Sequence, residues 1–483
     1  MKVLVVYDDT AAYSEVIRDV IGKKRLGDVV VRKKKVQEHY FAALRRLFPT
    51  ASFCCVKSKF EFQENYAEWS NLEDVRVLHC FSRFVFLDAD AALLSFEKLN
   101  YVNAPYRALC GKQTAALFFP DVRSYLELLK SYQRRGEDGP SLEALVPNAF
   151  PISGLLDIGV VSNFIQYITG AFDSRFFNRL DGNEYTLTKS STNREKIKKE
   201  YTFYQLLPED MKPWFVMPYQ YQETAERASY TMERLHVTDL AIQWVHGSFS
   251  LPEFEELMDK YFYFFQNVRH SKTVSREVYQ KNADALYVDK VKARLQQMKD
   301  APAGQKVLRL LEAADVSLDA LAGQYFALKA QLEAEVKRPA VSVIGHGDPC
   351  FSNVLYNKNT KMMKFIDPKG ALTEAELWTD PYYDLAKLSH SVCGWYDFFN
   401  NGLVDVRLSE DLSYTLELDF DNSPFVAVFR RKLEEAGFDF RLVRLYEASL
   451  FLSMLPLHLD YPYKVLGFIL NAQRILKEVE GYV

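Results

Sequence analysis

Apolar runs and amphipathic stretches alternate along the first part of the chain. Short runs typical of strands, with β-branched or aromatic side chains, lie at 1–7, 29–32, 51–56 and 84–87. Helical periodicity appears between them and after them, at 38–47 and 124–132. Strands that alternate with helices predict a layered α/β domain over residues 1–155. The polar segment 134–141, with two glycines and a proline, predicts a loop near the end of this domain.

A different pattern begins near Asp157. Three short antiparallel strands are predicted at 164–168, 175–180 and 184–189, and an amphipathic helix follows at 193–207. Another strand is predicted at 228–235. Together these elements indicate a small β-rich region at 156–235.

The remainder of the chain, 236–483, is mostly helical by its periodicity. The clearest predicted helices lie at 253–265, 275–299 and 316–336. Alternation typical of strands returns at 340–344 and 362–366, and each of these strands leads into a polar segment.

Composition narrows the possible functions. At 483 residues the chain is too long for one hydrophobic core, since cores stop growing at about 250–300 residues. The net charge of −4 gives no electrostatic argument for a nucleic-acid partner. The six cysteines lack metal-ligand spacing, and no apolar run is long enough to span a membrane. We therefore expect a cytoplasmic protein with neither a nucleic-acid partner nor a membrane span.

The most specific motif is His346-Gly347-Asp348, followed by Asn353 and then by Asp367. Phosphoryl transfer needs a carboxylate to accept the proton of the attacking hydroxyl, and oxygen ligands for Mg²⁺. Asp348, Asn353 and Asp367 would supply these groups from two loops. The alternative is an ordinary loop with capping Asp and Asn side chains and an unrelated third residue.

This spacing matches the catalytic and metal loops of kinases, and the HGD variant resembles the aminoglycoside phosphotransferase and choline kinase families. The resemblance implies an α+β protein-kinase-like bilobal fold, with a small β-rich lobe at 156–235 and a mostly helical lobe at 236–483. It implies ATP and Mg²⁺ as cofactors. One departure is Asp367-Pro368-Lys369-Gly370 in place of Asp-Phe-Gly, and the fixed φ of proline predicts a stiffer metal loop.

The resemblance also assigns roles to residues. Asp348 would be the catalytic base, His346 would orient its loop, and Asn353 and Asp367 would hold the metal. Asp384, in an Asp-Leu-Ala segment, would brace the catalytic loop.

Kinases also hold the ATP phosphates with a strand lysine that pairs with a helix glutamate, and Lys189 and Glu200 are the candidates. Gly170, in a predicted turn at 169–174, would lie over the phosphates, although a plain hairpin turn explains it equally well. By resemblance the adenine would be bordered by Met232, Glu233 and Leu235.

These features predict a kinase that transfers the ATP γ-phosphate to a hydroxyl of a sugar, polyol or amino alcohol. The phrases IDPKG and HGDPCFSN look like those of bacterial phosphotransferases of capsule or surface-polysaccharide loci. One alternative is a bifunctional enzyme, because Asp88 and Asp90 after an apolar strand resemble the metal site of glycosyltransferases and nucleotidyltransferases. A helix cap explains that pair as well. The other alternative is a nucleotide-binding pseudokinase scaffold.

Overall fold

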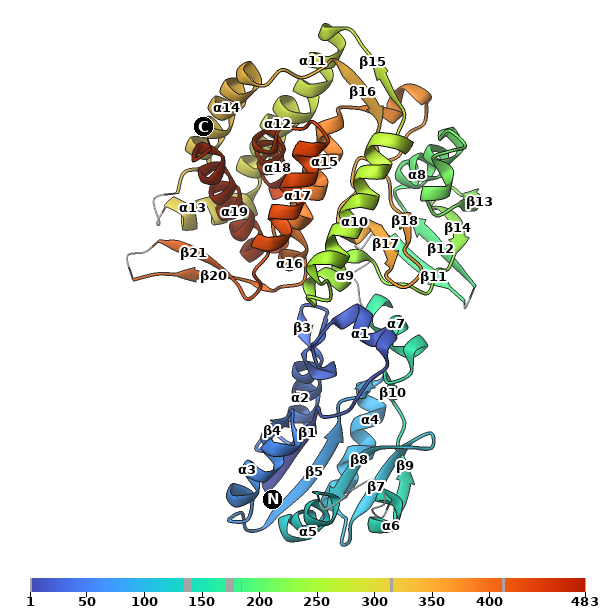
Figure 1. Ribbon diagram of the computed structural model, residues 1–483. Coiled ribbons are helices and arrows are strands. Elements are labelled where there is room, and N and C mark those ends of the chain that lie inside the picture. The colour runs from blue at the N-terminus through green and yellow to red at the C-terminus, as the bar shows by residue number, and fades with distance from the viewer. Residues whose placement is uncertain are drawn as a thin grey trace. The chain divides into compact units, whose positions relative to one another are not determined.

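The computed structural model describes residues 2–133, 141–170, 178–183, 185–312, 316–410 and 413–482. The chain divides into two compact units, Met1–Phe172 and Asp173–Val483 (Figure 1). The division falls after the expected boundary at 155, because helix α7 (Val161–Gly170) lies against helix α1 (Glu15–Ile21) of the first unit.

The first unit is built on a six-stranded mixed sheet in the order β4-β1-β5-β8-β7-β9. β1 pairs in parallel with both β4 and β5, whereas β8 is antiparallel to both β5 and β7. The strands are β1 (Lys2–Asp8), β4 (Ser52–Val56), β5 (Val75–Phe81), β7 (Tyr106–Cys110), β8 (Gln113–Phe119) and β9 (Ala149–Pro151). Two small pairs flank this sheet, namely β2 (Val30–Val31) with β3 (Lys34–Lys35), and β6 (Phe84–Phe86) with β10 (Leu155–Asp157).

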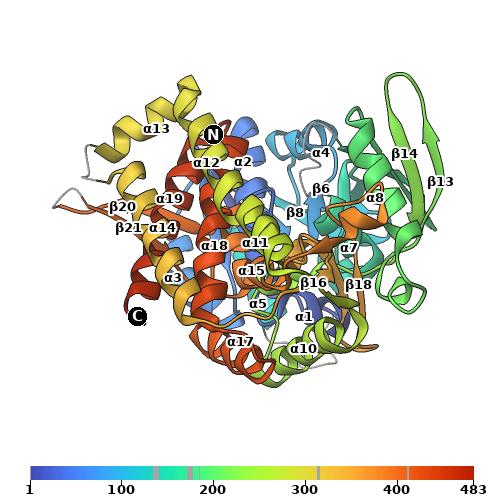
Figure 2. The same ribbon diagram turned by 90° about the horizontal axis from the view of Figure 1, so that it is seen from above.

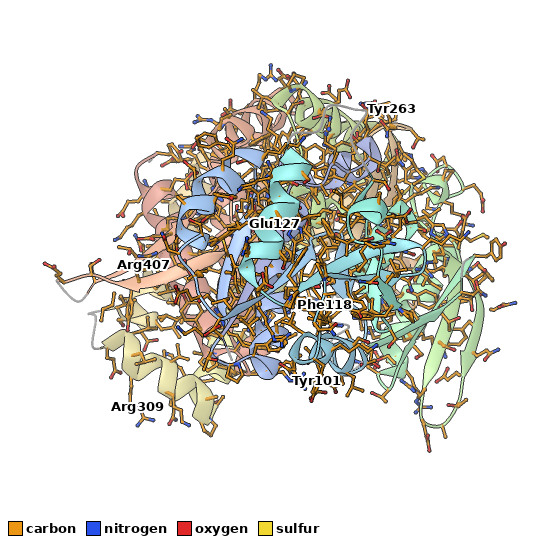
Figure 3. The ribbon with its side chains drawn as sticks, turned by 90° about the horizontal axis from the view of Figure 1, so that it is seen from below. Tyr101, Phe118, Glu127, Tyr263, Arg309 and Arg407 are labelled. Carbon is orange, nitrogen blue, oxygen red and sulfur yellow. The ribbon has the colours of Figure 1, made fainter. Side chains whose placement is uncertain are left out.

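Helices cover both faces of this sheet, which explains the continuous apolar run of β1. Val5 and Tyr7 join a core with helices α2 (Val36–Leu47) and α4 (Ala89–Phe96). Leu4 and Val6 point to the opposite core, with α3 (Lys59–Trp69) and α5 (Val122–Gln133). Figure 3 labels Phe118, which is fully buried in this sheet. The remaining helical segments are η1 (Leu26–Asp28), η2 (Glu97–Asn100) and α6 (Leu142–Leu145).

The second unit begins with a four-stranded antiparallel sheet in the order β11-β12-β14-β13. Its strands are β11 (Asn178–Gly182), β12 (Thr186–Ser191), β13 (Pro218–Glu223) and β14 (Ala228–Glu233). Helix α8 (Arg194–Leu206) packs on β13 and β14 (Figure 2). Ile197 of α8 is fully buried in a small core with Ala228 and Tyr230 of β14.

Helices make up most of the rest of this unit, around one large core. They are α9 (Leu240–Val245), α10 (Leu251–Tyr263), α11 (Arg276–Asp284), α12 (Lys290–Asp300), α13 (Pro302–Glu312), α14 (Leu318–Glu335), α15 (Pro381–Val392), α16 (Tyr396–Asn400), α17 (Ser423–Glu435), α18 (Phe440–Met454) and α19 (Pro462–Glu480). The short helical segments are η3 (Lys212–Trp214), η4 (Phe264–Val268), η5 (Ala285–Asp289), η6 (Phe351–Asn353), η7 (Glu374–Leu377) and η8 (Leu455–His458).

Small sheets interrupt these helices. β16 (Val341–Ile344) pairs with β15 (Ser271–Thr273) and β19 (Trp378–Thr379). β17 (Val354–Asn357) and β18 (Met362–Phe365) form a hairpin, as do β20 (Val404–Leu408) and β21 (Tyr414–Leu418). β16 and β18 were both predicted from alternation, and each ends immediately before one of the two candidate loops.

The structure corrects the predicted strand at 164–168. These residues lie in helix α7, where Phe164, Ile165 and Ile168 form one buried face. Their β-branched and aromatic content favoured a strand, but the spacing i, i+1, i+4 also fits a helix, and short apolar runs do not separate the two. Of the turn predicted at 169–174, residues 169 and 170 belong to α7, and 171–174 lie outside the described residues.

Candidate functional site

A buried lysine joins three elements of the second unit. Lys189 of β12 places its Nζ 2.8 Å from Glu200 Oε2 of α8 and 2.8 Å from Asp367 Oδ1, which follows β18. Tyr230 of β14 donates a further hydrogen bond of 3.0 Å to the same Glu200 oxygen. Lys189 and Glu200 are each only 3% exposed, so this pair excludes water.

The electrostatics of this trio favour the charged forms of lysine and aspartate. Burial acts to lower the pKa of Lys189, but Asp367 and Glu200 overcome it and raise the pKa above its ordinary value. Burial likewise acts to raise the pKa of Asp367, and Lys189 overcomes it, so this pKa lies below its ordinary value. Lys189 is therefore a fixed positive charge beside an ionised carboxylate.

The loops that carry Asp348 and Asp367 are bonded to each other. The Ile366 amide donates to the Asn353 carbonyl at 3.0 Å, and the Lys369 amide donates to the His346 carbonyl at 2.9 Å. A third contact between the two loops comes from the His346 side chain, whose Nε2 lies 2.9 Å from the Ile366 carbonyl oxygen. The predicted catalytic and metal loops are therefore adjacent.

His346 holds its loop and has no nitrogen left to move a proton. A carbonyl only accepts, so Nε2 carries the hydrogen, and Nδ1 accepts from the Asp348 amide at 3.1 Å. Burial lowers the pKa of His346, which keeps the ring neutral. The ring also stacks on Phe215. These contacts make His346 a positioning residue.

Asp348 forms an ion pair that the sequence analysis missed. Lys387 Nζ of α15 lies 3.0 Å from Asp348 Oδ1. Burial acts to raise the pKa of Asp348, but Lys387 overcomes it, so the pKa lies below its ordinary value. The spacing from Asp384 could have revealed Lys387, because residues i and i+3 of one helix share a face.

Asp384 of α15 binds the backbone of the loop that carries Asp348. Its Oδ2 accepts from the His346 amide at 3.0 Å, and its Oδ1 accepts from the Gly347 amide at 2.8 Å. Arg269 lies 3.5 Å from the same carboxylate, and both side chains are almost fully buried. This geometry agrees with the bracing role expected for Asp384.

The donor set suits Mg²⁺, which prefers oxygen ligands and keeps several of its own waters or substrate oxygens. Asn353 donates its Nδ2 to the Asp348 carbonyl at 2.8 Å, which leaves the amide oxygen as the ligand atom. Asp367 contributes a carboxylate that is 39% exposed. Within the described ranges no group of three or more His, Cys, Asp or Glu side chains could hold a metal, so the candidate set is one carboxylate and one amide.

Backbone geometry fixes the metal loop against α8. Asp367 adopts a left-handed φ of 54°, and Gly370 has a φ of 87°. A Cβ on Gly370 would lie 2.7 Å from the Lys199 carbonyl carbon, and the Ala371 amide donates to the Lys199 carbonyl at 3.1 Å. The loop that carries Asp367 is therefore attached to the helix that carries Glu200.

Of the residues predicted to border adenine, Met232 lies near this trio. Met232 of β14 lines a narrow cleft together with Glu200, Tyr230 and Asp367. Glu233 ends β14 opposite Thr186, and Leu235 lies in the connector that leads to α9. Their contact with a nucleotide stays a prediction.

Gly170 is not in the turn that was expected for it. It is the last residue of α7, in the first unit. The strand on which its phosphate-binding role depended is wrong, because 164–168 is helical. That role is therefore without structural support.

The Asp88 and Asp90 pair of the first unit has a structural explanation. Asp88 caps α4, accepting hydrogen bonds from the Asp90 and Ala91 amides at 3.1 Å. Asp90 forms an exposed ion pair with Arg46 at 2.7 Å. Both carboxylates are thus engaged at a helix start, as the capping alternative predicts.

The sequence matches no protein-family model and no curated protein. The solved structures that align with it include small-molecule kinases. Aminoglycoside phosphotransferase APH(4)-Ia aligns over 66% of this chain and 99% of its own, with 13% identity and a TM-score of 0.38. The ethanolamine kinase of Plasmodium vivax aligns over 74% and 94%, with 9% identity and a TM-score of 0.35. No helix in the described part of the chain is long and apolar enough to cross a membrane.

Proposed function

We propose that this chain transfers the γ-phosphate of ATP to a hydroxyl group of a small molecule. The observation that carries the proposal is the convergence of Lys189, Glu200 and Asp367, with the Asp348 loop bonded to the loop of Asp367. A buried strand lysine held by a helix glutamate supplies a fixed positive charge for phosphates. The fold we infer for the second unit is protein-kinase-like, with the β11–β14 sheet and α8 as its smaller lobe.

In this reaction Asp348 accepts the proton of the acceptor hydroxyl while that oxygen forms a bond to the γ-phosphorus. The bond from the γ-phosphorus to the bridging oxygen breaks, and ADP leaves. Lys387 keeps the Asp348 carboxylate ionised and contacts its Oδ1, so Oδ2 would be the oxygen that accepts the proton. Mg²⁺, held by Asn353 and Asp367, would neutralise charge on the phosphates.

A thermal-shift screen tests nucleotide binding directly. The full-length protein should be stabilised by MgATP, and Asp367→Ala should lose most of that stabilisation while it still folds. Asp405→Asn, an exposed change on β20, serves as the control and should respond as the wild type does. Absence of stabilisation by any nucleotide would end the assignment.

A turnover screen then identifies the acceptor. ADP release would be measured with sugars, polyols, choline and ethanolamine, because these carry the hydroxyl class that the proposal requires. Asp348→Asn should lower turnover by about 10²–10⁴-fold with MgATP binding retained, since the base is lost and the nucleotide contacts are kept. Tight MgATP binding with no turnover on any acceptor would favour the pseudokinase scaffold. A role in surface-polysaccharide synthesis stays a prediction from sequence resemblance.

A further inference from the structure

The proposed base Asp348 lies beside two lysines, and in the described part of the chain only one of them has an acidic partner. Lys387 of α15 forms the ion pair with Asp348 at 3.0 Å. Lys290, the first residue of α12, donates from Nζ to the hydroxyl oxygen of Tyr383 at 2.9 Å. Tyr383 precedes Lys387 by four positions on α15, so both side chains lie on one face of that helix. Two ammonium groups therefore share the surroundings of one ionised carboxylate.

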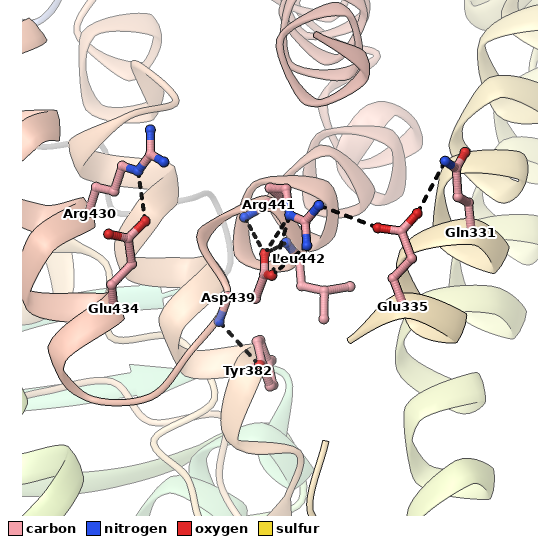
Figure 4. A network of polar contacts seen from close by, with 8 residues as sticks. All are labelled: Gln331, Glu335, Tyr382, Arg430, Glu434, Asp439, Arg441 and Leu442. Carbon is pink, nitrogen blue, oxygen red and sulfur yellow. Dashed lines mark hydrogen bonds and ion pairs between the residues drawn. The ribbon is translucent and has the colours of Figure 1, made fainter. Parts of the chain in front are cut away.

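Other cations of this unit face acids, as they do at the turn between α17 and α18 (Figure 4). Arg430 Nε donates to Glu434 Oε1 at 2.8 Å, and Arg441 Nη2 donates to Asp439 Oδ2 at 2.9 Å. Lys290, by contrast, forms no ion pair with any residue that the structure describes, and its partner is a neutral phenol. Its positive charge is therefore not balanced by a neighbouring carboxylate of the described chain.

The hydroxyl group of Tyr383 reports on the field of these two lysines. Burial acts to raise its pKa, because the side chain is only 3% exposed. Lys387 and Lys290 overcome that effect, so the pKa of Tyr383 lies below its ordinary value. Asp348 acts in the opposite direction and is outweighed. The electrostatic potential beside the proposed base is therefore positive.

Hydrogen-bond donors outnumber acceptors at the same place. Tyr383 accepts from Lys290, so its own hydroxyl hydrogen is left to donate, and no residue of the described ranges accepts it. The ammonium group of Lys387 has three hydrogens, and Asp348 is its one ion-pair partner among those residues. A buried donor without an acceptor is costly, so these groups favour a ligand that brings oxygen atoms rather than ammonium hydrogens.

A ligand can reach the charged groups of this cluster. The side chain of Asp348 is 38% exposed and that of Lys387 is 13% exposed, and Lys290 is half-buried. Asp397 is a further carboxyl close to Asp348, but it is only 1% exposed, and burial raises its pKa to about 7. Asp397 is therefore too buried to meet a ligand and carries too little charge to cancel both ammonium groups.

We propose that the acceptor carries an anionic group, a carboxylate or a phosphate, close to the hydroxyl that is phosphorylated. The hydroxyl would meet Asp348, and the anionic group would meet Lys290 and the remaining hydrogens of Lys387. This inference rests on the proposed function and narrows its acceptor class to hydroxy acids and phosphorylated alcohols. It disfavours amino alcohols, since an ammonium group would meet two positive charges.

Matched acceptors test the preference directly. One series is glucose, glucuronate, glucose 6-phosphate and glucosamine, and the other is glycerol, glycerate, glycerol 3-phosphate and 2-amino-1,3-propanediol. ADP release with MgATP gives kcat/KM for each compound on the full-length protein. An anionic member should exceed the neutral member of its series by about tenfold or more, and the cationic member should be the poorest. The carboxylate and phosphate members of each series show which anion the site takes.

Variants of Lys290 then test whether this residue sets the preference. Lys290→Met should lower the ratio of kcat/KM for the anionic member to that for the neutral member by about tenfold, whereas Lys290→Arg should keep most of it. The controls are Lys292→Met, exposed on the same helix α12, and Lys306→Met, exposed on α13, and neither should change the ratio. A merely structural role of Lys290 would lower both rate constants and leave their ratio unchanged.

The outcomes separate this inference from the proposed function. A protein that binds MgATP but prefers neutral or cationic acceptors, or that uses none of the anionic ones, would overturn the inference alone. An unchanged ratio in Lys290→Met would overturn it as well. Failure of the full-length protein to bind MgATP would instead end the proposed function, and this inference with it.

Discussion

The Asp348–Lys387 ion pair sets the pH range in which the proposed base can work. Because the pKa of Asp348 is lowered, its carboxylate stays ionised at pH values below the ordinary pKa of an aspartate. It loses function only when the pH falls through the lowered pKa of the folded state. The same sign applies to stability, so the contribution of this pair is present at neutral pH and lost in strong acid.

Removal of the ammonium group should therefore shift the acidic limb of the rate profile. In Lys387→Met, the largest influence that opposes burial is removed and the pKa of Asp348 should rise, so kcat should fall at a pH about one unit or more higher than in the wild type. The measurement is kcat against pH, with Lys306→Met as the control. An unchanged acidic limb would show that Lys387 does not tune the base.

Lys189 stabilises the fold as well as serving the proposed function. Lys189→Met would leave Glu200 buried without its cation and should lower the free energy of unfolding by about 3 kcal/mol or more. Glu200→Gln added to this variant should recover part of the loss, because the unpaired charge is gone. Denaturant unfolding of the single and double variants measures both steps, and additive losses would contradict the pairing.

Sequence reasoning named several residues that the structure brings together, because these residues sit in fixed local spacings. Asp348 and Asn353 share one loop, and Lys189 and Glu200 lie on consecutive elements. Lys387 was missed because its partner is 39 positions earlier (387 − 348), and the i, i+3 spacing from Asp384 was the one local signal that pointed to it.

At the level of elements, the metal loop depends on a glycine at its contact with α8. Gly370→Ala should lower both the free energy of unfolding and the affinity for MgATP, because the new Cβ collides with the Lys199 backbone. Gly437→Ala is a matched control with a similar φ of 82° and open space around its Cβ. Both variants should lose about 1–2 kcal/mol from the left-handed backbone, and Gly370→Ala should lose more.

The measurements are denaturant unfolding and MgATP titration of both glycine variants. Equal losses in the two variants would mean that the contact between the metal loop and α8 is unimportant. A loss of affinity confined to Gly370→Ala would tie that contact to nucleotide binding.

Strands and helices with strong periodicity were predicted well, and short apolar runs were not. The helix predicted at 193–207 is α8, and the strands at 340–344 and 362–366 are β16 and β18 within one residue. The segment 164–168, predicted as a strand, is part of helix α7. A run of five residues is too short for its apolar spacing to distinguish a buried helix from a strand.

At the level of the whole molecule, each unit has its own hydrophobic cores. Among the residues that the structure describes, the large core of the second unit takes none from the first, and the two cores of the first unit lie on the two faces of its sheet. The sequence predicted an N-terminal domain that ends at 155 and two lobes at 156–235 and 236–483, because residues 164–168 of α7 were taken for a strand of the smaller lobe.

Independent cores predict independent folding. A fragment of residues 178–483 should unfold cooperatively and bind MgATP with an affinity within about threefold of the full chain. Circular dichroism melts and MgATP titration of the fragment and the full chain give the comparison. A fragment that fails to fold, or that folds without binding MgATP, would show that the first unit completes the second.

The attachment of the metal loop to α8 has a consequence for control of the protein. A movement of α8 that pulled Glu200 away from Lys189 would either break the Ala371–Lys199 backbone hydrogen bond or move the loop of Asp367 together with the helix. States in which only one of these two contacts is formed are therefore unfavourable. A conformational switch that moved α8 would have to break the Glu200–Lys189 pair and the Ala371–Lys199 hydrogen bond together.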